Sequence, residues 1–148
     1  MSVDDEASKR GRMARNKGKR GERGVVEWLK KMGFPNCRRT AQRRGDGVGD
    51  VECDELPYLH IEVKLWATFN PGKLREACFQ ALRDKPKGHE CIVIWRCTDD
   101  KQAKRWRMCY LKSKYGGARV IGVPPDLDKC KNKLIQLNTR AAKRHVDK

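Results

Sequence analysis

The feature that most constrains the fold is a segment in which apolar and polar side chains alternate. From Leu59 to Leu65, leucine, isoleucine and valine take every second position, and His60, Glu62 and Lys64 stand between them. Successive side chains of a β-strand point to opposite faces of the sheet. The pattern therefore predicts a strand with one buried apolar face and one face that carries all three polar side chains.

A second short strand is predicted just upstream, over 48–53, and the turn-prone segment 54–57 would join the two strands into a hairpin. Antiparallel neighbours lie about 4.8 Å apart, so we expect Asp50 to lie near Glu62, with the Lys64 ammonium beside them. Two carboxylates so placed suit Mg²⁺, which prefers oxygen ligands and keeps several waters. A bound metal acidifies water, and a lysine can orient that water and stabilise developing charge. The alternative is a solvated sheet face with an exposed ion pair that contributes little.

This segment resembles the active-site motif of the PD-(D/E)XK nucleases, the restriction-endonuclease-like superfamily. Gly49-Asp50 stands for the PD of the motif, with glycine in place of proline, and Glu62-Val63-Lys64 stands for (D/E)XK. The resemblance implies that Asp50 and Glu62 bind Mg²⁺ and that the backbone carbonyl of Val63 is a further ligand. It also implies that Lys64 orients the attacking water. Mn²⁺ would fit the same oxygen ligands.

A helix is predicted over 19–32, because apolar side chains recur there at helical spacing, and Gly33 ends it. Glu22 lies on the same stripe, where an unpaired charge is costly. It has two explanations: a favourable interaction with the helix N-terminus, or a position at the metal site. The superfamily resemblance implies the second. Gly21-Glu22-Arg23 looks like the Gly-x-x-Glu-Arg-Glu start of archaeal-type Holliday-junction resolvases and virus-type replication-repair nuclease domains, although a second acid is missing here.

The remaining pattern predicts alternating strands and helices. A first strand starts at residue 37, a second helix spans 72–84, further strands cover 90–96, 105–111 and 120–123, and a last helix spans 126–137 with Asp126 as its cap. This order resembles the superfamily core, an α/β fold with a mixed central sheet flanked by helices. The resemblance also makes Gln80, on the second helix, a candidate that supports the site. An exposed helix glutamine is the plain alternative.

The charge of the chain points to a polyanionic partner. Lysine and arginine total 35 against 19 acidic residues, a net charge of +16, which is typical of nucleic-acid binding. We expect a flexible basic arm over 1–17, a nuclease domain over 18–137 and a basic tail over 138–148. The side chains expected to grip phosphates are Lys19, Arg20, Arg38, Arg39, Arg43 and Arg44. The last four precede a glycine-rich loop that admits a close phosphate.

These expectations converge on a Mg²⁺-dependent endonuclease that hydrolyses phosphodiester bonds in DNA. The small size, the basic arms and the absence of a base-reading module resemble a Holliday-junction resolvase of DNA recombination and repair, acting as a homodimer on four-way junctions. The alternatives are a flap or nicking replication-repair nuclease of the same superfamily and a non-catalytic basic protein that binds DNA or RNA. With no signal peptide or membrane span in the pattern, and with most of the seven cysteines expected as buried thiols, we expect a cytoplasmic or nucleoid-associated protein.

Overall fold

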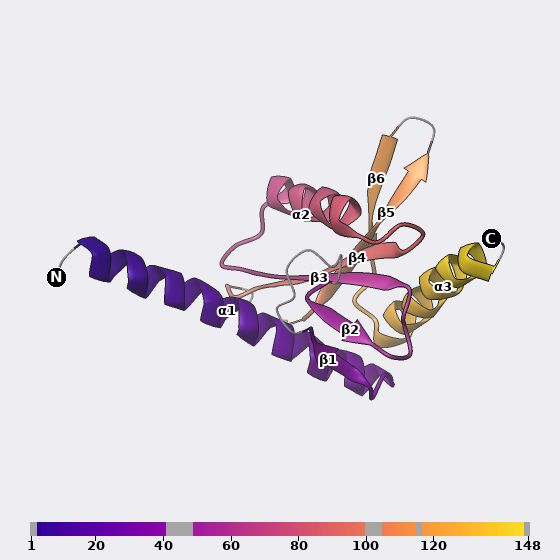
Figure 1. Cartoon of the computed structure of the whole chain (residues 1–148), viewed down its shortest axis with the longest axis horizontal. Helices are drawn as coiled ribbons and strands as arrows, with labels where there is room; N and C mark the ends of the chain where they lie inside the picture. The colour runs from indigo at the N-terminus through magenta and orange to yellow at the C-terminus, as the bar shows by residue number, and fades with distance from the viewer. Residues whose placement is uncertain (1–2, 41–48, 100–104, 115–116, 147–148) are drawn as a thin grey trace.

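The computed structural model describes residues 3–40, 49–99, 105–114 and 117–146. Within these ranges, six strands form one mixed sheet and three helices flank it (Figure 1). The strands are β1 (Cys37–Arg39), β2 (Val51–Cys53), β3 (Leu59–Trp66), β4 (Glu90–Cys97), β5 (Arg107–Lys114) and β6 (Gly117–Val123). The helices are α1 (Val3–Met32), α2 (Pro71–Asp84) and α3 (Leu127–Val146). The predicted α/β fold, a mixed sheet flanked by helices, is confirmed.

The strands follow one another across the sheet in chain order. All neighbouring pairs are antiparallel except β3 and β4, which run parallel and are joined by α2. A parallel pair needs such a crossover, because a tight turn can join only antiparallel strands. The strand pair β2–β3 is the hairpin predicted from the sequence.

Two apolar layers hold the helices against the two faces of the sheet. On one face, Val25 and Leu29 of α1 and Leu134 of α3 pack with Ile61 and other strand residues. On the other face, the small residues of α2 pack against β4 and β5, at Ala77, Cys78, Ala81, Val93 and Cys109. Because β3 alternates, the face opposite Ile61 carries its polar side chains.

Helix α1 begins at Val3, so most of the arm predicted as flexible over 1–17 is helical. Three acids in its first turn favour this start, since they interact well with the helix N-terminus. Its C-terminal half packs on the sheet, and its N-terminal half extends beyond the body of the protein (Figure 1). The close approach of α1 to the sheet depends on glycine. A Cβ at Gly24 would lie 2.7 Å from Cζ2 of Trp106, and one at Gly21 would lie 3.3 Å from Cβ of Leu65.

Helix α3 and the β5–β6 hairpin are also longer than predicted. The apolar stripe of α3 continues past the predicted end at residue 137 to Ala141, which is fully buried, so part of the predicted tail is helix. Asp126 caps this helix as predicted, since its Oδ1 accepts a 3.0 Å hydrogen bond from the N–H of Lys129. No helix among the described residues has both the length and the apolarity to cross a membrane.

Candidate active site

The β2–β3 hairpin brings Asp50 and Glu62 together. Asp50 directly precedes β2, and its N–H donates a 2.8 Å hydrogen bond to the carbonyl of Ile61. Its Oδ2 accepts a 2.8 Å hydrogen bond from the N–H of Val63. The two carboxyl groups then lie close enough for each to shift the pKa of the other. Two acids twelve positions apart in the chain therefore share one site.

Gly49 makes this approach possible. A Cβ added at Gly49 would lie 2.3 Å from the carbonyl oxygen of Ile61 and 2.7 Å from its nitrogen, and neither backbone atom can move without breaking the hairpin. Thr40 holds the same turn from the other side, with its Oγ1 donating a 2.6 Å hydrogen bond to the carbonyl of Gly49. Proline also carries a Cβ and would meet the same clash with Ile61. This explains why glycine stands where the PD motif that this segment resembles has proline.

His60 is a further member of the site, although the sequence pattern alone assigns it no role. Its imidazole is buried, and its Nε2 lies 2.8 Å from Oε1 of Glu62. The alternation of β3 places His60 and Glu62 on the same face, and this pattern could have predicted that His60 lies beside Glu62. What the sequence could not show is that this part of the face is buried: only 8 % of Glu62 is exposed.

The two carboxyl groups differ in acidity because their surroundings differ. Burial, followed by the negative charge of Glu62, raises the pKa of Asp50 to about 7, and the hydrogen bond from Val63 opposes this shift only in part. Burial also disfavours the ionised form of Glu62, but hydrogen bonds with His60 and Asp50 and the charge of Lys64 lower its pKa overall. Below about pH 7, the pair therefore holds one proton, mainly on Asp50, and one negative charge, mainly on Glu62.

Glu22 reaches this site from α1. Its Oε2 accepts a 2.8 Å hydrogen bond from Nε of Arg39, and both side chains are partly buried. The charge of Glu22 contributes to the raised pKa of Asp50, which places the two acids within electrostatic range. The explanation of Glu22 by the helix N-terminus is wrong, because α1 begins at Val3 and the dipole effect is confined to the first turn.

The other predicted site residues are distributed more widely. Lys64 is half-buried on β3 and acts on Glu62 through its charge. Gln80 is exposed on α2, and its part in catalysis stays a prediction, as does metal binding by the carbonyl of Val63. Lys19 and Arg20 are exposed on α1.

The predicted phosphate contacts on β1 already have protein partners. Arg38 donates to Glu52 at 2.9 Å and to Asp54 at 2.8 Å, and these partners raise its pKa. Arg39 is bound to Glu22. Arg43 and Arg44 lie outside the described residues. Arg39 therefore holds Glu22 at the site, whereas Arg38 is engaged by Glu52 and Asp54.

The cysteines include a bonded pair that the sequence does not predict. Cys37 and Cys53 are directly opposite each other on β1 and β2 and form a disulfide, whereas the five other cysteines are buried thiols. The disulfide ties β1 to β2, the strand that Asp50 directly precedes. The pairing depends on strand register, which the scattered cysteine spacing does not reveal.

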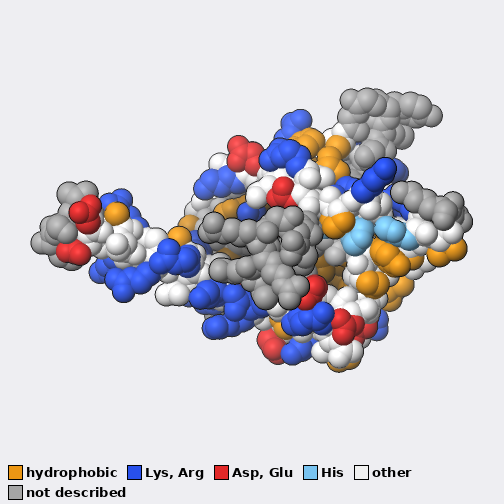
Figure 2. All heavy atoms as spheres, viewed as in Figure 1, with side chains coloured by type: hydrophobic (Ala, Val, Ile, Leu, Met, Phe, Trp, Pro, Cys, Tyr) orange, Lys and Arg blue, Asp and Glu red, His pale blue; other side chains and the backbone are white. Residues whose placement is uncertain are grey.

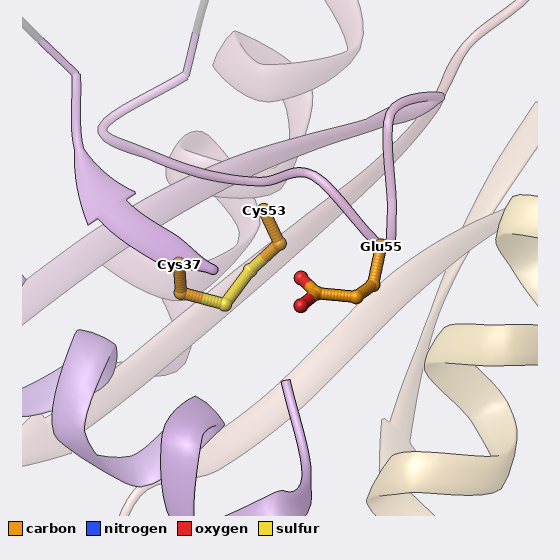
Figure 3. A group of neighbouring side chains, drawn as sticks. All are labelled: Cys37, Cys53 and Glu55. Atoms are coloured by element: carbon orange, nitrogen blue, oxygen red, sulfur yellow. A yellow bond between two sulfur atoms is a disulfide. The ribbon is translucent and has the colours of Figure 1, made fainter. Parts of the chain in front are cut away.

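Glu55 lies beside this disulfide (Figure 3). Its Oε1 accepts hydrogen bonds from Asn36, at 3.0 Å from the backbone nitrogen and 2.9 Å from Nδ2. In the described part of the chain, this is the one group of three metal-ligand side chains with donor atoms within 4.8 Å. Metal binding by cysteine requires a thiolate, which a disulfide lacks, so the oxidised group does not fit a metal ion. The Asp50–Glu62 pair, with its hard oxygen donors and exchangeable proton, fits Mg²⁺ better.

No family model and no curated protein matches the chain.

Proposed function

We propose that the protein is a Mg²⁺-dependent endonuclease that hydrolyses phosphodiester bonds in DNA. The observation that carries this function is the buried Asp50–Glu62 pair, in which Glu62 raises the pKa of Asp50 and the charge of Lys64 helps to lower that of Glu62. Burying two carboxyl groups in contact is unfavourable unless a cation compensates them. A divalent ion in place of the proton would provide that compensation. The order of helix, antiparallel strands, crossover helix and parallel strand also agrees with the PD-(D/E)XK resemblance.

Each residue of the site has a distinct task in this mechanism. Asp50 and Glu62 would hold the ion, and Glu22 would add a carboxylate directly or through a water. The ion, when bound, supplies an acidified water and neutralises charge on the phosphate. The Val63 N–H fixes the carboxylate of Asp50, and His60 fixes that of Glu62.

Lys64 supplies the remaining positive charge. Its ammonium lies on the same face of β3 as Glu62, where it would orient the attacking water and stabilise the charge that develops on the phosphate. Arg39 keeps Glu22 directed at the site. The superfamily resemblance implies that Gln80 of α2 would also support the active site.

Nucleic acid is the polyanion that the surface favours. Lysine and arginine side chains gather along the exposed part of α1 (Figure 2). They include Lys17, Lys19, Arg20 and Arg23, which line a hollow of about 710 Å³ next to Glu22 in the chain. Phosphate contacts made there would release counterions, so binding should weaken steeply as salt rises.

The substrate class within DNA follows from size and symmetry. A small chain with basic helices at both ends suits a four-way junction cut symmetrically by a homodimer, since two active sites then follow the two-fold axis of the junction. We therefore propose Holliday-junction resolution, in the cytoplasm or at the nucleoid, as the biological role.

Cleavage of three substrates tests this function. A four-way junction, a flap and a linear duplex are incubated with Mg²⁺ and wild type, Asp50→Asn or Lys64→Ala. Both variants should bind DNA and cleave none of the substrates. The matched controls Glu76→Gln and Lys73→Ala, at exposed positions on α2, should cleave like wild type.

The products separate the alternatives. Paired ligatable nicks near the crossover indicate a resolvase, and cuts confined to the flap or to single strands indicate a flap or nicking nuclease. Binding without products under any divalent ion would leave a non-catalytic DNA- or RNA-binding protein. Wild-type cleavage by Asp50→Asn would remove the mechanism.

A further inference from the structure

An aromatic cluster lies at the end of β3, just past Lys64. Trp66 of β3 and Trp95 of β4 have ring centroids 6.0 Å apart. Phe69, in the segment that leads to α2, stacks on Trp95 with centroids 5.1 Å apart and planes 23° apart. Phe69 is nevertheless 51 % exposed. A large apolar ring held flat on the surface by its neighbours is a preformed stacking platform.

This cluster is next to the proposed active site. In the parallel pair β3–β4, Lys64 is the register partner of Trp95, and across the antiparallel pair β4–β5, Trp95 is the partner of Arg107. Register partners on adjacent strands point to the same face and lie about 5 Å apart. The face that carries Glu62 and Lys64 therefore continues into Trp95 and then Arg107.

A pocket of about 460 Å³ opens on this platform. Its lining combines aromatic rings, two guanidinium groups and one carboxylate: Phe69, Trp95, Cys97, Asp99, Arg105 and Arg107. The guanidinium carbon of Arg107 lies 5.7 Å from the ring centroid of Trp95, so this arginine is held over an aromatic face. The pocket thus combines a flat apolar wall with charged side chains in its lining.

We infer, on the basis of the proposed nuclease function, that this pocket receives one unstacked nucleobase of the DNA strand next to the cleaved phosphate. Every base has a π-face that can stack on Phe69, and stacking requires no particular sequence. Arg105 and Arg107 meet the phosphates on either side of the base. Asp99 repels phosphate from the pocket and offers an acceptor to a base that carries an amino group.

This pocket gives the enzyme a way to recognise DNA structure without reading sequence. A base inside a continuous duplex must leave its stack before it can enter, which costs free energy, whereas a nucleotide at a branch point, including the crossover of a four-way junction, has already lost part of its stacking. DNA with such a nucleotide next to the cut is therefore the preferred ligand.

A double-mutant cycle between protein and DNA tests the inference. The full-length protein is titrated, in EDTA, with a fluorescent forked duplex whose first unpaired nucleotide carries a base or is abasic. Phe69→Ala should weaken binding of the base-containing fork about tenfold and leave binding of the abasic fork unchanged. Phe69→Tyr should restore the preference for the base. Ile135→Ala, an exposed apolar position on α3, is the matched control and should bind both forks like wild type.

The possible results are distinct. Equal binding of both forks by wild type, or equal weakening of both by Phe69→Ala, would overturn the inference. Because EDTA prevents cleavage, this result does not depend on catalysis. A protein that prefers the base-containing fork but never cleaves would contradict the proposed function alone. Cleavage with no base preference would contradict the base pocket alone.

Discussion

His60 Nε2 lies 2.8 Å from Glu62 Oε1, and only 2 % of the histidine is exposed. The ring fixes one carboxylate oxygen of Glu62, so the orientation of that carboxylate toward Asp50 is set before any ligand arrives. Groups that hold a metal-binding carboxylate in this way act through its geometry. His60 is therefore a positioning residue of the proposed site.

His60→Ala should lower cleavage about 10- to 100-fold and raise the Mg²⁺ concentration that gives half-maximal activity, because Glu62 loses its fixed orientation. His60→Gln keeps a hydrogen-bond donor and should recover part of the loss. Mg²⁺ titrations of initial cleavage rate measure both effects. His145→Ala, an exposed histidine on α3, serves as the control. An unchanged Mg²⁺ dependence in His60→Ala would contradict the positioning role.

Asp50→Asn should stabilise the metal-free protein, and more so as pH rises. The folded protein raises the pKa of Asp50 from 3.8 to about 7, so the contribution of the Asp50 carboxyl group to wild-type stability is fully present below pH 4 and is lost as pH rises through 7. Asparagine carries no charge at any pH, so the free energy of unfolding of the variant lacks this decrease. The stability difference should grow by roughly 2 kcal/mol between pH 5 and pH 8. Urea unfolding in EDTA at both pH values measures it, and a difference that shrinks as pH rises would refute the burial of the Asp50 charge.

Gly49→Ala should destabilise the protein by about 2 kcal/mol or more, because the added methyl group overlaps the backbone of Ile61. Gly18→Ala is the opposite case. Nothing lies within 4 Å of a Cβ there, and alanine in a helix interior is favoured over glycine by about 1 kcal/mol. Thermal unfolding of the two variants should therefore move in opposite directions. Equal shifts would show that Gly49 does not approach Ile61 closely.

Removal of the Cys37–Cys53 disulfide should lower stability by about 3 kcal/mol, the value expected for a loop of this length. The variant Cys37→Ala/Cys53→Ala should be less stable than oxidised wild type. Reduced wild type provides the control, since reduction opens the same loop without changing a side chain. Both proteins should unfold at similar urea concentrations, and a variant as stable as the oxidised protein would contradict the stabilising role of the bond.

The sequence was most informative where local periodicity and burial agree. The alternation around Glu62 predicted β3, and the stripe through Val25 and Leu29 predicted the part of α1 that packs on the sheet. It was least informative where the chain lacks an apolar face. Residues 3–17 are polar and were expected to be flexible, but acids in the first turn and good helix formers such as Ala7 support a helix there.

The site residues also differ in how far the sequence could predict their partners. The proximity of Asp50 and Glu62 followed from strand spacing, because a hairpin fixes the separation of facing residues. The partner of Glu22 did not follow, because it depends on how α1 crosses β1. Arg39 looked like a phosphate contact in the sequence and lies against Glu22 in the fold. Long-range pairs of this kind require tertiary structure.

Under the proposed function, the length of α1 has a consequence for where the protein would protect DNA. At 1.5 Å per residue, Arg10 lies about 18 Å along the helix from Glu22, which corresponds to about five base pairs of a duplex that follows the helix. Because this helix projects from one side of the body (Figure 1), each subunit should shield backbone farther on one side of its cut than on the other. Hydroxyl-radical footprints should extend about half a helical turn farther on one side of the cut than on the other. Deletion of residues 1–17 should make the two sides equal in length.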